Sequence, residues 1–522
     1  MSKEEPQAVV DENAQDVPKI SEMRFRLLML GLIMSIFISS LDNTIVSTAL
    51  TAIASEFNAL NQVTWVVASY LLTSTAMQPL YGKLSDIFGR KLTILFALLC
   101  FLVGSAFCGA ATSSLMLVIF RAVSGIGGGG LFSLSVIIIS DIVPLKDRAI
   151  YMGLVGSIFA LASIAGPLVG GAFTDDLTWR WAFYINIPIL LITIITVCLF
   201  LDLPKPEGSL GEKMNRIDFV GAFLLVLAVV CAVLGLSWGG NEYEWNKYQV
   251  ILPLCLGVVL FALFLLNEFK TKAEPIIPMS IFNRNIVGAN LISFFYGALG
   301  MVIIYYLPIY YQVVKRKSST RAGLELLPML LGSVFCNIVN GIITTRTGIY
   351  RSITRLGTLV TLVGIILMGG LFRSSITRYE ELGYVLVIGL GIGLCYQNNT
   401  IISQAAAKEG DIAVVTSLVF FSNLLGGVIG VAIQGAIFIN ALTAELSSTL
   451  PNLSAKDIAS SLKVIQGLTT GEQELVNQAY FHALKVMFLS MIPYAVFPCF
   501  ASAMLKHIPL RGHNSTNVPL GH

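Results

Sequence analysis

The sequence GKLSDIFGRK, residues 82–91, joins two apolar stretches and decides the fold of this chain. A glycine opens this segment and another lies near its end, and glycine lets a chain turn tightly between two helices. The turn holds charged residues at a membrane surface, where they and an acid at the end of a later apolar stretch can pair. We expect a latch that stabilises one state of a helical bundle, although a simple turn with a topology signal would also use basic residues here. The predicted latch residues are Gly82, Asp86, Gly89, Arg90, Lys91 and Asp141.

The composition outside this segment is that of a membrane protein. Of 522 residues, 55% are hydrophobic and only 12% are charged, and the mean hydropathy is +0.80. A soluble domain carries about 25% charged residues, so this chain lacks the charge to cover a soluble globule. The near balance of 33 basic and 30 acidic residues argues against a nucleic-acid partner. The sequence shows no cluster of His, Cys and carboxylate residues, so no metal site is predicted.

Apolar runs long enough to cross a bilayer recur along the whole chain, and each crossing needs about 20 residues. An even number of crossings places both termini on one side. Basic residues favour the cytosolic side, and they are about twice as frequent in the segments that share a side with the termini. We therefore predict cytosolic termini, although the basic cluster at 315–321 falls on the outer side. The fourteen predicted spans lie at about 25–54, 62–81, 92–111, 114–140, 150–172, 182–201, 217–237, 249–268, 287–312, 322–344, 354–372, 383–403, 413–440 and 483–505.

A glycine pattern in the first half of the chain recurs in the second half. Gly82 and Gly89 match Gly341 and Gly348, and the set Gly125, Gly127, Ala149 and Gly166 returns 264 positions later as Gly389, Gly391, Ala413 and Gly430. Repeated halves with a binding site between them are typical of secondary transporters. The expected domains are a disordered cytosolic tail at 1–24, a six-helix bundle at 25–201, a linker with two extra spans at 202–286, a second six-helix bundle at 287–505 with an outer loop at 441–482, and a cytosolic tail at 506–522.

Five segments carry a resemblance to a known family. Residues 82–91 resemble the loop signature of the major facilitator superfamily, and RAVSGIG at 121–127 resembles its fourth-helix motif. LDNTIV at 41–46 and WRWAFYINIP at 179–188 are similar to its fourteen-helix drug:proton antiporter family. AGPLVGG at 165–171 resembles the fifth-helix motif of the antiporters. The resemblance implies an all-α major facilitator fold, with two six-helix bundles, two extra helices and both termini inside.

The fifth-helix motif implies a helix that bends and seals one gate. Its residues are Gly153, Gly166, Pro167 and Gly170. Ala162 stands where the antiporter pattern usually has glycine, which is a mild departure. Ordinary packing of small residues between helices is the alternative interpretation of this segment.

Two charged residues lie well inside predicted spans. Asp42 is in the middle of the first span, and Arg121 is about 12 Å from the outer end of the fourth. Charges at such depth are costly, so they indicate function and need a partner or a cavity. We predict that Asp42 carries the coupling proton and that Arg121 tunes it, as the resemblance also implies. A static buried ion pair is the alternative.

Polar residues in the second half suggest a cavity for the transported solute. Aromatic rings attract flat or cationic organic molecules, and amides can hydrogen-bond to them. The same side chains could equally pack against neighbouring helices or lie in an aromatic belt at the membrane surface. Since the repeat places uncharged residues at the positions of Asp86, Arg90 and Arg121, we expect the charged machinery in the first half. The candidate cavity residues are Tyr296, Tyr306, Gln397 and Asn398.

The predicted function is proton-coupled antiport of small organic solutes, cationic or amphipathic, out of the cytosol. The glycine run at 127–130 lies within a span and lacks a Gly-Lys-Ser/Thr ending, so it is not a phosphate loop. No nucleotide-binding domain is recognised, so an ion gradient or the solute's own gradient is the expected energy source. The resemblance implies the proton gradient, and we expect no cofactor and no enzymatic activity. The expected partners are the solute, protons and the lipid bilayer, and the protein is expected to be a monomer in the plasma or vacuolar membrane.

Two alternatives to this function stay open. QPLYGKLSD at 78–86 also resembles the fungal vacuolar basic amino-acid transporters, which would move solute into an acidic lumen. Only one acid lies deep in a span, which gives a dicationic amino acid little to pair with. A membrane receptor or scaffold that has lost transport is the alternative from another class, because a fold does not fix a function.

Overall fold

The computed structural model describes most of the chain as helix. The described residues are 21–57, 63–204, 206–240, 243–271, 273–373, 377–450 and 468–510. Within them the only bridges of β type are two isolated ones, at the ends of the linker helices. Most of the predicted N-terminal tail at 1–24 lies outside the described residues, as does most of the predicted C-terminal tail at 506–522.

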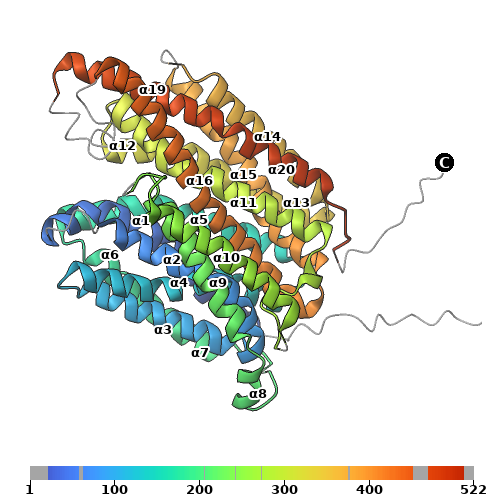
Figure 1. The fold of residues 1–522 in the computed structure, drawn as a ribbon. Helices are drawn as coiled ribbons and strands as arrows, with labels where there is room; N and C mark the ends of the chain where they lie inside the picture. The colour runs from blue at the N-terminus through green and yellow to red at the C-terminus, as the bar shows by residue number, and fades with distance from the viewer. Residues whose placement is uncertain are drawn as a thin grey trace, which may run out of the picture.

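The N-terminal half forms one bundle, drawn in blue and cyan in Figure 1. Its local signals are clear: Gly89, with φ at +92°, ends one helix and starts the next, and Ser113 caps another by accepting from the Met116 N–H. Its helices are α1 (Glu22–Phe57), α2 (Val63–Phe88), α3 (Arg90–Gly109), α4 (Ser114–Ile142), α5 (Arg148–Asp176), α6 (Trp181–Tyr184) and α7 (Asn186–Phe200).

The C-terminal half forms the second bundle, drawn in yellow to red. Its helices are α11 (Arg284–Ile309), the π-helical η3 (Tyr310–Val314), α12 (Ser319–Leu324), α13 (Leu327–Thr347), α14 (Arg351–Gly370), α15 (Arg378–Ala406), η4 (Glu409–Asp411), α16 (Ile412–Thr449), α19 (Thr470–Ser490) and α20 (Ile492–Met504). The polar segment at 441–482 is therefore not all loop, because α16 extends to its Thr449 and α19 begins at Thr470. Thr469 caps α19 together with Glu472, which explains how a polar sequence starts a helix there.

The segment between the halves lies across both of them, in front of the seam in Figure 1. Its elements are α8 (Leu210–Asn215), α9 (Phe219–Trp238), α10 (Tyr248–Lys270) and η2 (Met279–Ile281). A separate apolar core joins it to both halves, with Leu80 from α2, Leu225 and Val229 from α9, and Leu418 from α16. The two extra helices thus cover the α2–α16 seam.

Thirteen helices of the described residues are long and apolar enough to cross a membrane. The helix α2 is not among them, although it has 26 residues. It packs against both α4 and α16, so its polar residues, such as Gln78 and Thr75, are buried inside the protein and lower its hydropathy. The fourteenth span and the cytosolic position of the termini stay predictions.

The repeat suggested by the sequence has a counterpart in the contacts between the halves. A Cβ added to Gly82 would lie 2.9 Å from the carbonyl oxygen of Ala413. In the other half, a Cβ on Gly341 would lie 2.7 Å from the carbonyl oxygen of Ala149. These residues are each other's repeat partners, so α2 meets α16 in the same way as α13 meets α5.

The contacts inside each half repeat in the same way as the contacts between the halves. A Cβ on Gly125 would lie 2.4 Å from the carbonyl oxygen of Tyr70, and one on Gly389 would lie 2.1 Å from that of Met329. Tyr70 and Met329 are as far apart in the sequence as Gly82 and Gly341. The helices of the two bundles therefore pack against one another in the same arrangement.

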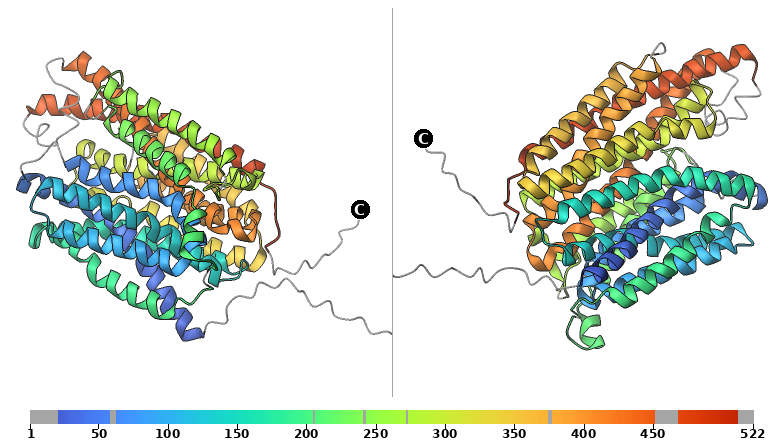
Figure 2. Two further views of the ribbon diagram at one scale, coloured as in Figure 1. Left: turned by 60° about the horizontal axis from the view of Figure 1, so that its bottom comes forward. Right: turned by 180° about the vertical axis from the view of Figure 1, so that it is seen from behind.

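The halves meet closely at the end of the bundle that carries residues 82–91, which we call the motif end. Gln404 of α15 donates to the Ser140 hydroxyl of α4 at 2.8 Å and to Thr416 at 2.9 Å. The Arg148 guanidinium donates to the Gln404 carbonyl oxygen at 3.3 Å. Figure 2 shows the two bundles converging toward this end from two further directions.

Candidate functional site

The two predicted intramembrane charges contact each other. Asp42 of α1 and Arg121 of α4 are 0% and 1% exposed. The Arg121 Nη1 donates to the Asp42 Oδ2 at 2.6 Å. A charged hydrogen bond in such an enclosed place is strong, and removal of either partner would leave an uncompensated buried charge.

Three neighbours orient this pair. The Arg121 Nε donates to the Val66 carbonyl oxygen at 3.1 Å, and its guanidinium lies 4.3 Å from the centre of the Tyr70 ring. The Asn186 amide donates to the Asp42 Oδ1 at 3.2 Å. Asn186 also donates to the Ser105 hydroxyl at 3.2 Å, so its amide is held between α1 and α3.

Asn186 is a site residue that the sequence analysis did not select. It belongs to the segment 179–188, so the resemblance marked its neighbourhood but not its role. Its position at the start of α7 carries its side chain into the bundle, where it is fully buried. The carboxylate of Asp42 therefore has two donors, one charged and one neutral.

The predicted latch is assembled around Arg90. Its Nε donates to the Asp141 Oδ2 at 2.7 Å, and its Nη1 donates to the Asp86 Oδ1 at 2.5 Å and to the Ser85 hydroxyl at 2.6 Å. Lys91 is not part of this group, because its Nζ donates to the Cys198 carbonyl oxygen at 2.7 Å. Arg90 thus ties α2 to α4 at the motif end, and Lys91 ties α3 to α7.

The linker between the halves adds a second ion pair to the same loop. Glu274 accepts from Lys83 and from Arg216, both at 2.6 Å. Partial burial would raise the pKa of Glu274, but its hydrogen bonds to Arg216 and Lys83 outweigh that effect, and its pKa lies below the ordinary value. Sequence reasoning missed this contact because Glu274 is far from the motif in the chain.

The predicted gate helix α5 faces a different neighbour at each end. A Cβ on Gly166 would lie 1.9 Å from the Thr44 hydroxyl, so α5 packs directly on the helix that carries Asp42. A Cβ on Gly153 would lie 2.8 Å from the Asn337 carbonyl oxygen, so this end packs on the other half. Gly170 accepts from Thr174 within the helix, and α5 continues through Pro167, whose side chain is outside those described.

The four candidate cavity residues have different surroundings in the structure. Tyr296 hydrogen-bonds to Thr361 at 3.1 Å and to Cys395 at 3.3 Å, inside the C-terminal half. Asn398 donates to Thr354 at 3.2 Å in the same interior. Tyr306 is half-buried against Phe438, with ring centres 5.6 Å apart.

Gln397 is the candidate that faces the other half. It is buried, and a Cβ on Gly153 would lie 2.9 Å from its carbonyl oxygen. Neither end of its amide has a hydrogen-bond partner among the described residues. Its neighbour Tyr396 stacks on Phe159 of α5, with ring centres 6.1 Å apart. A buried amide without partners, placed between the halves, is suited to bind a solute.

The C-terminal half contains a buried charged cluster that the sequence analysis did not anticipate. Glu381 accepts from the Tyr310 hydroxyl at 2.5 Å and from Lys315 at 2.9 Å. Glu325 accepts from Lys317 at 2.6 Å and from Arg378 at 3.0 Å. Both carboxylates are buried. We call this group the Glu381 cluster; it lies at the end opposite the motif end.

Buried charges are not confined to the first half, because these two buried acids occur in the second. The expectation that the charged machinery for transport lies in the first half stays a prediction. The basic residues at 315–321, which conflict with the predicted orientation, are largely neutralised: Lys315 and Lys317 pair within the cluster, and Arg316 lies 3.7 Å from Glu474.

Two repeated helical halves, with a buried acid–base pair inside the first, are typical of a secondary transporter. The family model of the Major Facilitator Superfamily matches residues 32–431. The chain belongs to this superfamily. Transport, rather than enzymatic activity, is therefore its class of function.

Curated relatives with similar sequences are fungal efflux proteins. The chain is 33% identical to "Efflux pump aflT" of Aspergillus parasiticus over 485 residues, which cover 92% of this chain and 93% of that protein. It is 32% identical to "Efflux pump FUS6" of Gibberella fujikuroi over 539 residues, with 99% and 95% covered. It is 36% identical to "Efflux pump aunC" of Aspergillus niger over 450 residues, with 86% and 80% covered.

Solved structures share the fold at low sequence identity. The human organic anion transporter MFSD10 matches with a TM-score of 0.58 at 15% identity, over 92% of this chain and 99% of that one. The proton:xylose symporter XylE matches with a TM-score of 0.56 at 14% identity, over 92% and 95%. These likenesses support the fold and leave the solute open.

Proposed function

We propose that this protein is a proton-coupled antiporter that exports small cationic or amphipathic organic solutes from the cytosol by alternating access. The observation that carries the proposal is the fully buried contact between Asp42 and Arg121 in the middle of the N-terminal half. A buried carboxylate is where a proton gradient can act on a protein with no other energy source.

A proton on Asp42 would change the balance of this site. The ionised carboxylate accepts hydrogen bonds from Arg121 and Asn186. Once Asp42 is protonated, the Arg121 charge is no longer neutralised, and a buried charge without a partner is costly. The site would then favour a conformation in which Arg121 reaches water or another partner, so proton binding and conformational change are linked.

The contacts at the motif end support the assignment of this structure to one state of the transport cycle. The predicted orientation places that end in the cytosol. There the Gln404 amide bonds to Ser140 across the halves, and Arg90 holds Asp86 and Asp141. This is the state closed toward the cytosol, in which protons and solute exchange with the far side.

The efflux relatives support the direction of transport. They are named efflux pumps, so export is the activity most consistent with this family position. The membrane is the plasma membrane or, for the vacuolar alternative, that of an acidic organelle. We propose that the protein works as a monomer, because each half supplies the partner for the other.

Transport by the purified protein in sealed vesicles with an imposed proton gradient tests the proposal. A fluorescent organic cation is compared with labelled lysine and arginine, in the native protein and in Asp42→Asn. The matched control is Asp176→Asn, which removes an exposed acid of α5. We expect gradient-driven movement of the dye that is lost in Asp42→Asn and kept in Asp176→Asn.

Each of the other possible outcomes would contradict one part of the proposal. Movement of lysine or arginine alone would replace the proposal with a basic amino-acid antiporter. Equal dye movement in Asp42→Asn would remove the coupling role of Asp42. Absence of any gradient-driven transport would favour a receptor or scaffold.

A further inference from the structure

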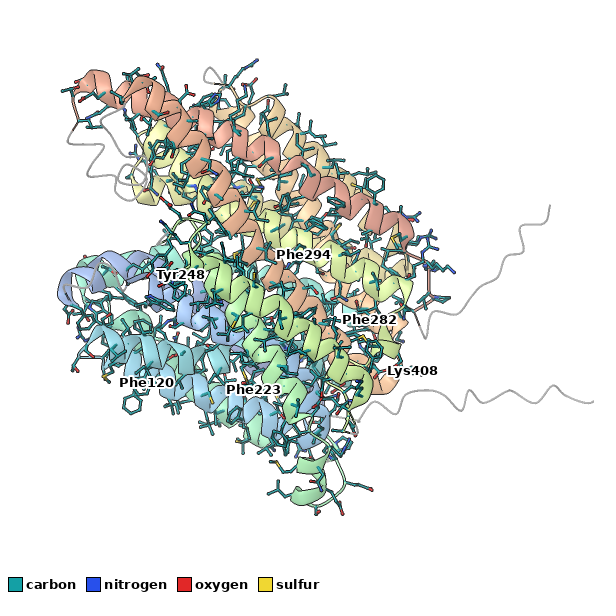
Figure 3. All side chains as sticks on the ribbon, in the orientation of Figure 1. Phe120, Phe223, Tyr248, Phe282, Phe294 and Lys408 are labelled. Atoms are coloured by element: carbon teal, nitrogen blue, oxygen red, sulfur yellow. The ribbon has the colours of Figure 1, made fainter. Side chains whose placement is uncertain are left out.

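A cavity of about 340 Å³ lies between the linker hairpin and α16, toward the end opposite the motif end. Its polar and aromatic wall consists of Glu244, Trp245 and Asn246 on the hairpin and Asn440 on α16. Figure 3 labels Tyr248, at the start of α10 beside this hairpin, and Lys408 at the motif end, far from it. The volume is within the range of about 300–1,000 Å³ that small-molecule sites occupy.

The backbone of the hairpin holds the Trp245 indole in place. A Cβ on Gly239 would lie 2.6 Å from the Trp245 ring, and one on Gly240 would lie 2.8 Å from its Nε1, so the ring lies directly on this turn. Gly240 has φ at +77° and donates from its backbone N–H to the Tyr243 carbonyl oxygen at 2.9 Å. A side chain at either glycine would displace the indole. The aromatic wall is therefore preformed.

The cavity has one wall on the linker hairpin and the other on α16 of the C-terminal half. Trp238, at the base of the hairpin, packs edge-on against Trp65 of α2, with ring centres 5.9 Å apart. This contact fixes the hairpin to the N-terminal half. The facing wall, with Asn440, belongs to the C-terminal half. Any movement of one half relative to the other would change the size of this cavity.

The chemistry of the wall favours an organic cation. The face of a Trp ring attracts a positive charge, and a carboxylate adds to this attraction. The Glu244 carboxylate has one described cationic neighbour, Lys247 at 3.8 Å, and both are exposed, so this pair contributes little and leaves Glu244 able to attract another cation. The Trp245 Nε1 has no acceptor among the described residues, and Asn246 and Asn440 can donate or accept.

We propose that this cavity, which we call the Trp245 site, binds amphipathic aromatic cations at the end of the bundle opposite the motif end. The class of solute assigned to this site rests on the proposed function, whereas the existence of the site does not depend on Asp42. Trp245 stacks on the cation, Glu244 supplies the opposite charge, and Asn440 contacts it from the C-terminal half. The site would hold a released solute away from the buried pair.

Binding of tetraphenylphosphonium to the full-length purified protein tests the site, with isothermal titration calorimetry as the measurement. We expect Trp245→Leu to weaken binding about tenfold, because the cation–π contact is lost. Glu244→Gln should weaken it by a smaller factor that disappears at high salt. Trp245→Phe keeps a ring and should retain most of the affinity. The matched control is Trp181→Leu, which removes a tryptophan of α6 that is 48% exposed and does not line this cavity.

The uncharged analogue triphenylphosphine oxide should bind at least tenfold more weakly than the cation. Unchanged tetraphenylphosphonium binding in Trp245→Leu, or equal loss in Trp181→Leu, would overturn the proposal. Asp42→Asn should leave the Trp245-dependent binding intact. If vesicle transport fails while this binding persists, the antiport proposal is wrong and the Trp245 site stands; if transport succeeds without it, the reverse holds.

Discussion

The buried charges of the two halves are arranged in opposite ways. In the N-terminal half, one acid and one base, Asp42 and Arg121, lie deep in their helices and neutralise each other. In the C-terminal half, the Glu381 cluster lies at helix ends, and its two acids are shared among several cations and a tyrosine. An isolated pair loses its balance when one proton binds, whereas a shared cluster can redistribute its hydrogen bonds. The first arrangement is suited to coupling and the second to holding a loop.

The largest expected effect breaks the isolated pair. Arg121→Met leaves the Asp42 carboxylate buried without its cation, and loss of one partner of such a pair costs about 3–5 kcal/mol. We expect lost transport and a lower melting temperature in detergent. The double variant Asp42→Asn with Arg121→Met should recover much of the stability and none of the gradient-driven transport. Equal melting temperatures for the single and double variants would show that the pair is not coupled.

A smaller effect is expected in the shared cluster. Glu381→Gln removes the charge that Lys315 and the Tyr310 hydroxyl approach, and loss of such hydrogen bonds costs about 1–3 kcal/mol. The protein should be less stable to heat yet still couple transport to the gradient. Tyr310→Phe combined with Glu381→Gln should add little, because the two residues share one contact. If transport by Glu381→Gln no longer depended on the gradient, the two halves would not differ in their role in coupling.

The next prediction concerns Asn186, which positions the side chain of Asp42 in the pair with Arg121. Asn186→Leu removes the neutral donor to Asp42 and should slow gradient-driven transport about tenfold, since a hydrogen bond to a charged group contributes about 1.5–3 kcal/mol. Asn186→Asp places a second carboxylate beside one arginine and should abolish transport. Thr193→Ala, a change on the same helix away from Asp42, is the control. Normal transport in Asn186→Asp would show that this contact does not orient Asp42.

The smallest effect concerns the linker contact at the motif end. Because the pKa of Glu274 lies below the ordinary 4.5, its ion pairs stabilise the folded protein fully above that pH, and the stabilisation is lost as the pH falls through the lowered pKa. Glu274 is partly exposed, so Glu274→Gln should cost less than about 1 kcal/mol at pH 7. Thermal unfolding of both proteins at pH 7 and pH 4 measures this difference. A difference that is larger at pH 4 would contradict the assignment.

The sequence identified the charged residues that lie deep in an apolar span or belong to a recognised motif. Asp42 and Arg121 interrupt apolar spans, and Arg90 and Asp141 belong to a motif, so each could be selected and each pair is in contact. Glu325 and Glu381 lie near the starts of predicted spans. Charged residues are common at the ends of spans, so nothing in the sequence was a reason to select these two. Their burial depends on how α12, η3 and α15 pack against one another.

Helix rotation is the property that the sequence did not reveal. Gln397 and Asn398 are adjacent, yet one faces the other half and the other bonds within its own bundle. Successive residues of a helix point about 100° apart, so a small error in rotation exchanges their roles. Long-range contacts such as those of Asn186 and Glu274 were missed for a related reason, because nothing in the local sequence specifies a partner far along the chain.

The hydrogen bond between Ser140 and Gln404 has an evolutionary consequence. The two residues are 264 positions apart, the offset of the repeat, so they occupy the same position in each half. Equivalent positions of a two-fold pair touch each other only on the symmetry axis. This contact therefore marks the axis that relates the halves, and in an ancestral homodimer of single halves the residue here would have faced its own copy. Gene duplication then allowed the two positions to diverge into a hydroxyl and an amide, a pairing that two identical chains could not make.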